Sequence, residues 1–406
     1  MVSSGNDAWS PQVVISDSGV AFAVWQESTL PPYGWLKVAR RTSESGWEPP
    51  ATLNGGRMSS LVLPELRVFD DGGAWVVWIE DAALLARHFD PQSGWSSPIV
   101  LGDSAAAAGR NPVLWTDTTG RGFVLWLSSS GWSVRHLEAQ GGWGAEEHLP
   151  DAGSRFESPS IALRSGGEID VVWERYESGS SPFTHTSVWA NRFVPGAGWT
   201  RVAPLAADAR LSCGTTIDPL GQLAVWGCRG DALNESSWGT WYVRRLADGG
   251  WGDVRQPASL PTDAAWRMLA SHGGSVLGLW SKGYYTSPGG LWGARLVSGG
   301  EWEAPQLIVE SGSVIDPIDL RMSSPSEGVV VWADGALGSD AQQIRSAQFA
   351  DGEWRQAQNV SGVANFGGIP YPFHMVVRPS GDAVAVWSQT TTGSPSSVWS
   401  NTFVTR

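Results

Sequence analysis

The sequence of 406 residues has little of what many kinds of functional site require. It holds two cysteines, too few for a cysteine-rich structural zinc site. No apolar run approaches the about 20 residues that a membrane-spanning helix needs. The opening stretch, MVSSGNDAW, contains neither a basic nor an apolar region, so it does not read as a signal peptide. We therefore expect no membrane span, in either a cytoplasmic chain or a processed form of an exported one.

Positive charge and catalytic motifs are scarce as well. The formal net charge is −13, and an acidic surface repels the phosphates of nucleic acids and anionic membranes. The sequence contains no HExxH, GxSxG, P-loop or EF-hand pattern. Its six histidines are scattered along the chain. These absences argue against nucleic-acid binding and against the enzyme classes that those motifs mark, and they give no catalytic residue to name.

Tryptophan and glycine are abundant instead, with 26 and 50 copies. Tryptophan buries more apolar area than most side chains, and glycine allows tight turns. A short apolar run that ends in Trp recurs eight times at a spacing of about 50 residues. Such a period is the signature of a repeat fold. The eight positions are Trp25, Trp78, Trp126, Trp173, Trp226, Trp280, Trp332 and Trp387.

Each repeat is organised in the same way. A Gly turn and a further apolar stretch precede most of the eight runs, which predicts a β-hairpin. A third strand follows a variable loop, as in VWANRF, and a fourth begins with Gly-Trp, as in GAGW. One four-stranded antiparallel sheet cannot cover both of its faces, whereas sheets packed around an axis can. The sequence predicts an all-β fold, a single eight-bladed β-propeller domain over residues 1–406.

The last blade is predicted to be incomplete, because no Gly-Trp strand follows it before Arg406. Residues 1–9 could supply a strand, but Trp9 lies too close to Pro11 to match the other Gly-Trp positions. We expect three strands there, or a chain that continues past residue 406.

Most of the tryptophans are expected to pack between blades, since 21 of the 26 fall at repeat positions. The other five are Trp9, Trp75, Trp115, Trp238 and Trp266. Trp238 is the candidate among them for stacking on a ligand, because it lies in a long loop.

Candidate ligand-binding residues follow the repeated Trp of the second strand, where the loop to the third strand begins. These loops vary most in length, and the longest follows Trp173. Rigid scaffolds carry function on such loops. The alternative is that these polar residues bind no ligand and only keep the rim formed by the loops in contact with solvent. The candidates are Glu27, Glu80, Glu174, Arg175, Tyr176, Arg229, Trp238, Lys282, Tyr284, Tyr285, Asp334 and Gln389.

Cys213 and Cys228 flank one predicted hairpin, CGTTIDPLGQLAVWGC, and would lie almost opposite each other. A cross-strand disulfide there would indicate an oxidising compartment. A pair of free thiols is the alternative.

The runs VVW, VWANRF and GAGW resemble those of Trp-rich bacterial propeller proteins of the extracytoplasmic space, and the resemblance covers nearly the whole chain. Propeller lectins share this design. The resemblance implies an extracellular or periplasmic, monomeric protein that binds a glycan without catalysis and without a cofactor, with calcium left open. A glycan-active hydrolase or lyase and a protein-interaction scaffold are the alternatives, so the question of an enzyme stays open.

Overall fold

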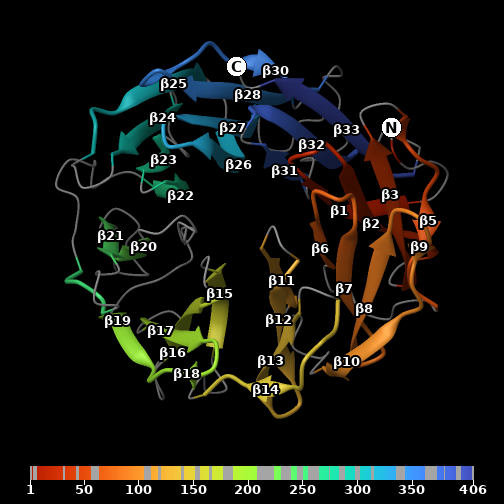
Figure 1. Ribbon diagram of the computed structural model, residues 1–406. Helices are drawn as coiled ribbons and strands as arrows, with labels where there is room; N and C mark the ends of the chain where they lie inside the picture. The colour runs from red at the N-terminus through yellow and green to blue at the C-terminus, as the bar shows by residue number, and fades with distance from the viewer. Residues whose placement is uncertain are drawn as a thin grey trace. The chain divides into compact units, whose positions relative to one another are not determined.

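The chain folds into antiparallel β-sheets, one for each repeat (Figure 1). No helix occurs in the residues that the structure describes, and so none is long and apolar enough to cross a membrane there. In this computed structural model the described residues are 2, 7–30, 33–42, 45–55, 64–104, 111–117, 120–138, 141–150, 156–163, 167–176, 186–207, 224–229, 239–244, 250–254, 265–273, 275–282, 289–297, 302–311, 315–334, 343–361, 373–378, 380–389 and 395–404.

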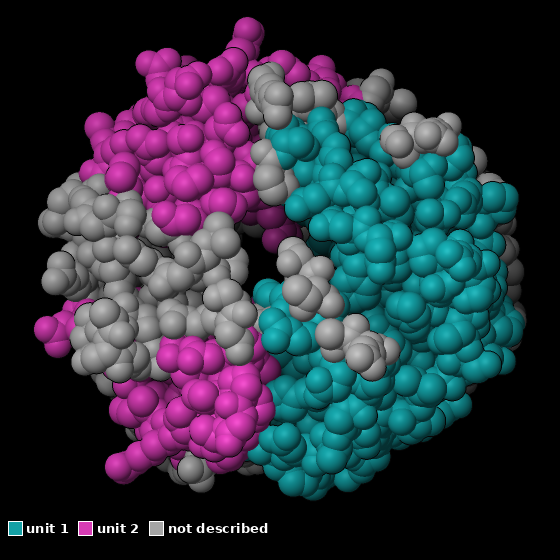
Figure 2. Space-filling view, in the orientation of Figure 1, with its two compact units in different colours: residues 1–149, 363–405 teal, residues 150–362, 406 magenta. Residues whose placement is uncertain are grey.

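The chain divides into two compact units, coloured separately in Figure 2. Unit 1 is residues 1–149 with 363–405, and unit 2 is residues 150–362 with residue 406. The expectation of one domain over residues 1–406 stays a prediction.

Unit 1 contains the first three sheets and the eighth, numbered in chain order. The first sheet has β1 (Asp7–Ile15), β2 (Ala21–Leu30), β3 (Tyr33–Thr42), β4 (Gly46–Trp47) and β5 (Ala51–Thr52). The second has β6 (Glu65–Val68), β7 (Ala74–Glu80), β8 (Ala83–Asp90), β9 (Gly94–Trp95) and β10 (Ile99–Asp103). The third has β11 (Val113–Thr116), β12 (Gly122–Ser128), β13 (Gly131–Leu137) and β14 (Glu147–His148), and the eighth has β31 (Phe373–Val377), β32 (Asp382–Gln389) and β33 (Ser397–Val404).

Unit 2 contains the fourth to seventh sheets. The fourth has β15 (Phe156–Leu163), β16 (Ile169–Tyr176), β17 (Thr186–Val194), β18 (Gly198–Trp199) and β19 (Ala203–Ala207), and the fifth has β20 (Ala224–Arg229) and β21 (Gly239–Arg244). The sixth has β22 (Ala265–His272), β23 (Ser275–Lys282), β24 (Gly289–Leu296) and β25 (Gln306–Ser311). The seventh has β26 (Ile315–Ser324), β27 (Glu327–Asp334), β28 (Gln343–Ala350), β29 (Glu353–Trp354) and β30 (Gln358–Asn359).

The turns between first and second strands confirm the role expected for glycine. Five of these glycines have φ between 79° and 89°, a left-handed conformation that other residues adopt at a cost. They are Gly19, Gly72, Gly120, Gly167 and Gly381.

The fourth strand is broken into two short pieces in several sheets, which the sequence did not predict. In the first sheet, β4 and β5 both pair with β3, and Pro49 and Pro50 lie between the two pieces. In the second sheet, Pro98 separates β9 from β10. Proline has no N–H to donate to a ladder, so pairing is interrupted where it occurs.

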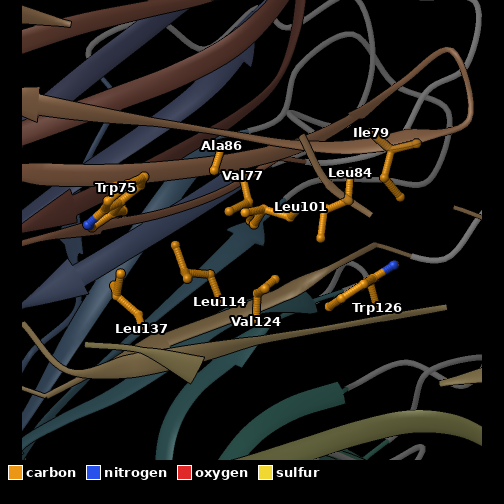
Figure 3. Packing of buried hydrophobic residues seen from close by; sticks show 10 residues of the cluster. All are labelled: Trp75, Val77, Ile79, Leu84, Ala86, Leu101, Leu114, Val124, Trp126 and Leu137. Carbon is orange, nitrogen blue, oxygen red and sulfur yellow. The ribbon is translucent and has the colours of Figure 1, made fainter. Parts of the chain in front are cut away.

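The repeated tryptophans pack between neighbouring sheets, as predicted. Trp126 of the third sheet lies in a cluster with Val77, Leu84 and Leu101 of the second, with Trp75 at the opposite end (Figure 3). Its indole N–H donates to the Asp103 carbonyl at 2.7 Å. A Cβ at Gly102 would lie 2.7 Å from the Trp126 ring, so only glycine fits this close approach.

The same packing recurs within each unit. Trp78 packs against the first sheet, Trp25 against the eighth, Trp332 against the sixth and Trp241 against the fourth. Seven of the eight second-strand tryptophans are buried, and the side chain of the remaining one, Trp226, lies outside the described residues.

Two tryptophans depart from the expected pattern. Trp35, at a repeat position of the third strand, is 37% exposed, so the expectation that it would pack between sheets is wrong. Trp75, outside the repeat positions, is 5% exposed and packs edge-on against Trp143 at 5.4 Å.

The eighth sheet has the three strands that were expected, and the N-terminal segment adds to it. The Val2 N–H donates to the Val398 carbonyl at 2.7 Å. The N–H groups of Leu53 and Leu149 donate in the same way to the carbonyls of Leu36 and Trp132, at 2.8 and 2.9 Å. Leu36 and Trp132 hold the third-strand position that Val398 holds in the eighth sheet. Val2 therefore occupies a fourth-strand position of the eighth sheet, which the sequence argument from Trp9 missed.

Replacing Trp126 by Ala should lower the free energy of unfolding by about 3–5 kcal/mol, because the cavity lies between two packed sheets. Trp35→Ala is the matched control, since that side chain is 37% exposed and should lose a small fraction of this value. Chemical denaturation of both variants checks the prediction. Equal losses would show that burial between sheets is not what makes the repeated Trp necessary.

Val2→Asp should destabilise the protein by about 1–3 kcal/mol, because it places a charge in an apolar cluster shared with Val384 and Val398. Val100→Asp is the control, since Val100 is 66% exposed whereas Val2 is 8% exposed. Thermal unfolding monitored by tryptophan fluorescence compares the two. A Val2 variant as stable as the Val100 variant would refute the role given to the N-terminal segment.

Candidate ligand-binding site

The first strand of each four- or five-stranded sheet lies at a sheet edge and pairs with the second strand. Prolines mark these edge strands, where one N–H is not needed for the ladder. Pro64, Pro112 and Pro372 stand just before the start of pairing, and Pro11, Pro159 and Pro317 stand where the register with the second strand is interrupted. In unit 1, β1 contacts both β31 and β6, and β6 contacts β11, so four first strands lie side by side (Figure 1).

Polar side chains from these four strands fall at one position of the repeat. Gln12, Glu65 and His374 each pair with the residue just before a repeated Trp, namely Val24, Val77 and Val386. Arg67 and Trp115 lie two residues further along β6 and β11, on the same side as that position. We call these five residues, Gln12, Glu65, Arg67, Trp115 and His374, the first-strand row.

The first-strand row is half-buried, whereas the alternate residues of the same strands are fully buried. Val13, Leu66, Leu114 and Met375 all have exposures of 0%. The period of two in a strand places apolar side chains in the core and leaves the row partly accessible to solvent. The row therefore gathers an amide, a carboxyl, a guanidinium, an imidazole and an indole from four sheets.

Glu65 and Arg67 form the charged part of the row. Arg67 Nη1 lies 3.2 Å from Glu65 Oε2, with side-chain exposures of 32% and 22%, and it also donates to the Leu66 carbonyl at 2.7 Å. Burial raises the pKa of Glu65, and this outweighs the lowering by the neighbouring Arg67 charge and hydrogen bond. Glu65 is thus enclosed by protein while still in contact with water, a combination common in functional sites.

Unit 2 repeats this pair at the equivalent position of the seventh sheet. Arg321 Nε lies 3.0 Å from Asp319 Oδ1, with side-chain exposures of 45% and 9%. Asp319 pairs with Val331, the residue before Trp332, as Glu65 pairs with the residue before Trp78. An acid followed two residues later by Arg is therefore one feature of the repeat that occurs in both units.

His374 ties two sheets of unit 1 together. Its Nδ1 accepts a hydrogen bond from the Val13 N–H at 3.4 Å. No group of three or more His, Cys, Asp and Glu side chains is arranged to hold a metal ion among the described residues. The row can donate and accept hydrogen bonds and offer one aromatic surface, which suits a polar organic ligand.

Several of the predicted ligand-binding residues already accept a hydrogen bond from a tryptophan of their own strand. The indole N–H of Trp25 donates to Glu27 at 3.3 Å, and that of Trp78 donates to Glu80 at 3.0 Å. Gln389 accepts from Trp387 in the same way, at 3.3 Å. Residues two apart in a strand share a face, so a Glu or Gln at this spacing satisfies the buried indole N–H.

The predicted residues of the fourth sheet lie at the end of β16. Glu174 is 3% exposed, and the Arg175 guanidinium lies over the Trp189 ring at 5.2 Å, a cation–π contact.

Other predicted residues cannot be placed. Trp238, Tyr284 and Tyr285 lie outside the described residues, as do the side chains of Tyr176, Arg229, Lys282 and Asp334. Cys213 and the side chain of Cys228 also lie outside them, so the disulfide stays a prediction.

Sequence reasoning missed the first-strand row, although a signal was present. The stretches PELR and PIDLR each place an acid and an Arg two residues apart after a proline. Aligning the first strands, rather than only the Trp-bearing second strands, would have shown this repeated pair.

No protein-family model matches the chain, and no curated protein sequence matches it. Among solved structures, the chain is similar to the β-propeller domain of the Trilobed protease from Pyrococcus furiosus, with a TM-score of 0.49, 10% identity, and 85% of this chain and 97% of that one covered. It is also similar to an ulvan lyase of polysaccharide lyase family PL25 (TM-score 0.48, 11% identity, 98% and 94% covered) and to the Aleuria aurantia lectin (TM-score 0.38, 14% identity, 90% and 98% covered). Likenesses at this level assign no function.

The Glu65→Gln variant should reveal the raised pKa of Glu65 through the pH dependence of stability. An acid whose pKa is raised by folding contributes most at low pH, and its contribution falls as pH rises from its unfolded pKa of about 4.3. Relative to the wild type, Glu65→Gln should therefore gain stability between pH 4 and pH 7, measured by urea denaturation.

Asp90→Asn is the control with the opposite sign. Hydrogen bonds from the Ser93 backbone and side chain and from the Gln92 backbone lower the pKa of Asp90. Asp90→Asn should lose stability relative to the wild type as pH rises over the same range. A Glu65 variant that follows the Asp90 variant would show that Glu65 is not enclosed as described.

Proposed function

We propose that this chain is an eight-bladed β-propeller that binds a carbohydrate without catalysis, as an extracellular or periplasmic monomer. The observation that carries the proposal is the first-strand row: polar side chains of complementary kinds converge from four neighbouring strands, next to residues of the same strands that are apolar and fully buried. Polar groups on apolar strands are costly unless they bond to the protein or to a ligand.

The chemistry of the row suits a sugar. Gln12 and His374 can both donate and accept hydrogen bonds, Arg67 donates, and Glu65 accepts. Sugar hydroxyls need donors and acceptors together, and an indole such as that of Trp115 can cover the apolar face of a pyranose ring. Half-burial of these side chains supports a site that water and a small ligand can both reach.

A glycan-active hydrolase or lyase is the second candidate, and one observation favours it. A carboxyl whose pKa is raised by burial, as in Glu65, can act as a proton donor. Glycoside hydrolysis normally requires a second carboxyl group opposite the first, and the first-strand row holds only one. Binding without turnover is therefore the better-supported function.

A glycan array probed with the purified protein, in calcium and in chelator, tests the proposal. We expect saturable binding to a defined class of glycan that Gln12→Ala weakens at least tenfold. Glu48→Gln is the control, because Glu48 pairs with Arg40 away from the row. The array would contradict the proposal if no glycan bound, and mass spectrometry showing shortened oligosaccharides after incubation would favour the enzyme instead.

A further inference from the structure

We infer that the protein binds acidic glycans, and that Arg67 in unit 1 and Arg321 in unit 2 each bind a carboxylate or sulfate group. This inference rests on the proposed function and names the class of ligand. It begins from the acid–Arg pair that occurs at the same repeat position in unit 1 and in unit 2.

In both pairs the arginine is the more exposed partner. Arg67 is 32% exposed over a Glu65 at 22%, and Arg321 is 45% exposed over an Asp319 at 9%. The acid therefore contacts one part of the guanidinium and leaves its other N–H groups accessible to solvent. A fixed guanidinium loses less conformational entropy when it binds an anion than a free one does.

The guanidinium of each pair retains donors for a second anion. The described contacts of Arg67 both use Nη1, which reaches Glu65 and the Leu66 carbonyl. Asp319 faces Nε and Nη2 of Arg321, at 3.0 and 3.4 Å. Because a guanidinium is a planar fork of N–H groups, an edge left open can bind a carboxylate or sulfate through two parallel hydrogen bonds.

Other arginines of the repeats are already used for packing. Arg40 lies over the ring of Phe89 at 5.5 Å and pairs with Glu48, and Arg295 lies over Phe349 at 5.5 Å and pairs with Glu303. These two guanidiniums stabilise contacts between neighbouring sheets. Arg67 and Arg321 have no such ring contact among the described residues, which leaves ligand binding as a role for them.

The net negative charge of the protein limits how an acidic glycan can bind. At −13 the protein repels polyanions at long range, so an acidic glycan would bind only through short-range, oriented contacts. Binding should therefore depend on where the acidic groups stand along the glycan.

Matched ligands test the charge of the glycan. Isothermal titration calorimetry should compare oligogalacturonides with the same oligomers fully methyl-esterified, and a sulfated glycan with its desulfated form. We expect the acidic member of at least one pair to bind at least tenfold more tightly than its neutral counterpart. The first comparison tests binding of carboxylates and the second tests binding of sulfates, so together they identify the source of the negative charge.

Matched variants test the residues. Arg67→Gln and Arg321→Gln should each weaken binding of the acidic member at least fivefold, in protein that still unfolds cooperatively. Arg355→Gln is the control, because Arg355 is also exposed and paired, with Asp351 at 3.0 Å, but lies beyond β29 near a turn. It should bind as the wild type does.

The outcomes separate this inference from the proposed function. Tight binding of neutral glycans that Arg67→Gln leaves intact would overturn the inference while the carbohydrate-binding function stands. Preference for acidic glycans with no effect of either variant would overturn the assignment of Arg67 and Arg321. Failure to bind any glycan on the array would remove the function on which the inference rests.

Discussion

Burial of one tryptophan per repeat between neighbouring sheets is the interaction on which the rest of this structure depends. Trp78, Trp126 and Trp332 each fill the space between their own sheet and the preceding sheet of their unit. Because the ring is large and rigid, the backbone that passes closest to it must lack a side chain, as Gly102 does. In three sheets the indole N–H donates to the Glu or Gln two residues later.

This packing explains why the polar row lies on the first strands. The second strand is buried on both faces, since Trp78 faces the first sheet while Trp75 and Val77 face the third. The first strand is at an edge, so only one of its two sides needs to be apolar. Its other side is free to carry Glu65, Arg67 and their counterparts at little cost to the core.

The all-β architecture of antiparallel sheets followed from the sequence because its signals are local and repeated. A strand of period two, a glycine turn and a Gly-Trp strand recur often enough that a misread element in one repeat does not alter the pattern. The broken fourth strand was not predicted, although prolines mark the break in the first and second sheets. The place of Val2 was missed because Trp9 was aligned with the Gly-Trp positions. Val2 instead corresponds to the apolar residues that follow each Gly-Trp, such as Leu53 and Leu149.

The site was harder to predict because the sequence does not show which polar side chains already form hydrogen bonds within the protein. Glu27 and Glu65 look alike in sequence, but Glu27 accepts a bond from Trp25 whereas Glu65 lies half-exposed beside Arg67. The most direct test of this distinction is a crystal structure of the protein with a bound oligosaccharide. The account predicts ligand density against Glu65 and Arg67. Density at the strand ends beside Glu27 or Glu174, with the first strands bare, would contradict it.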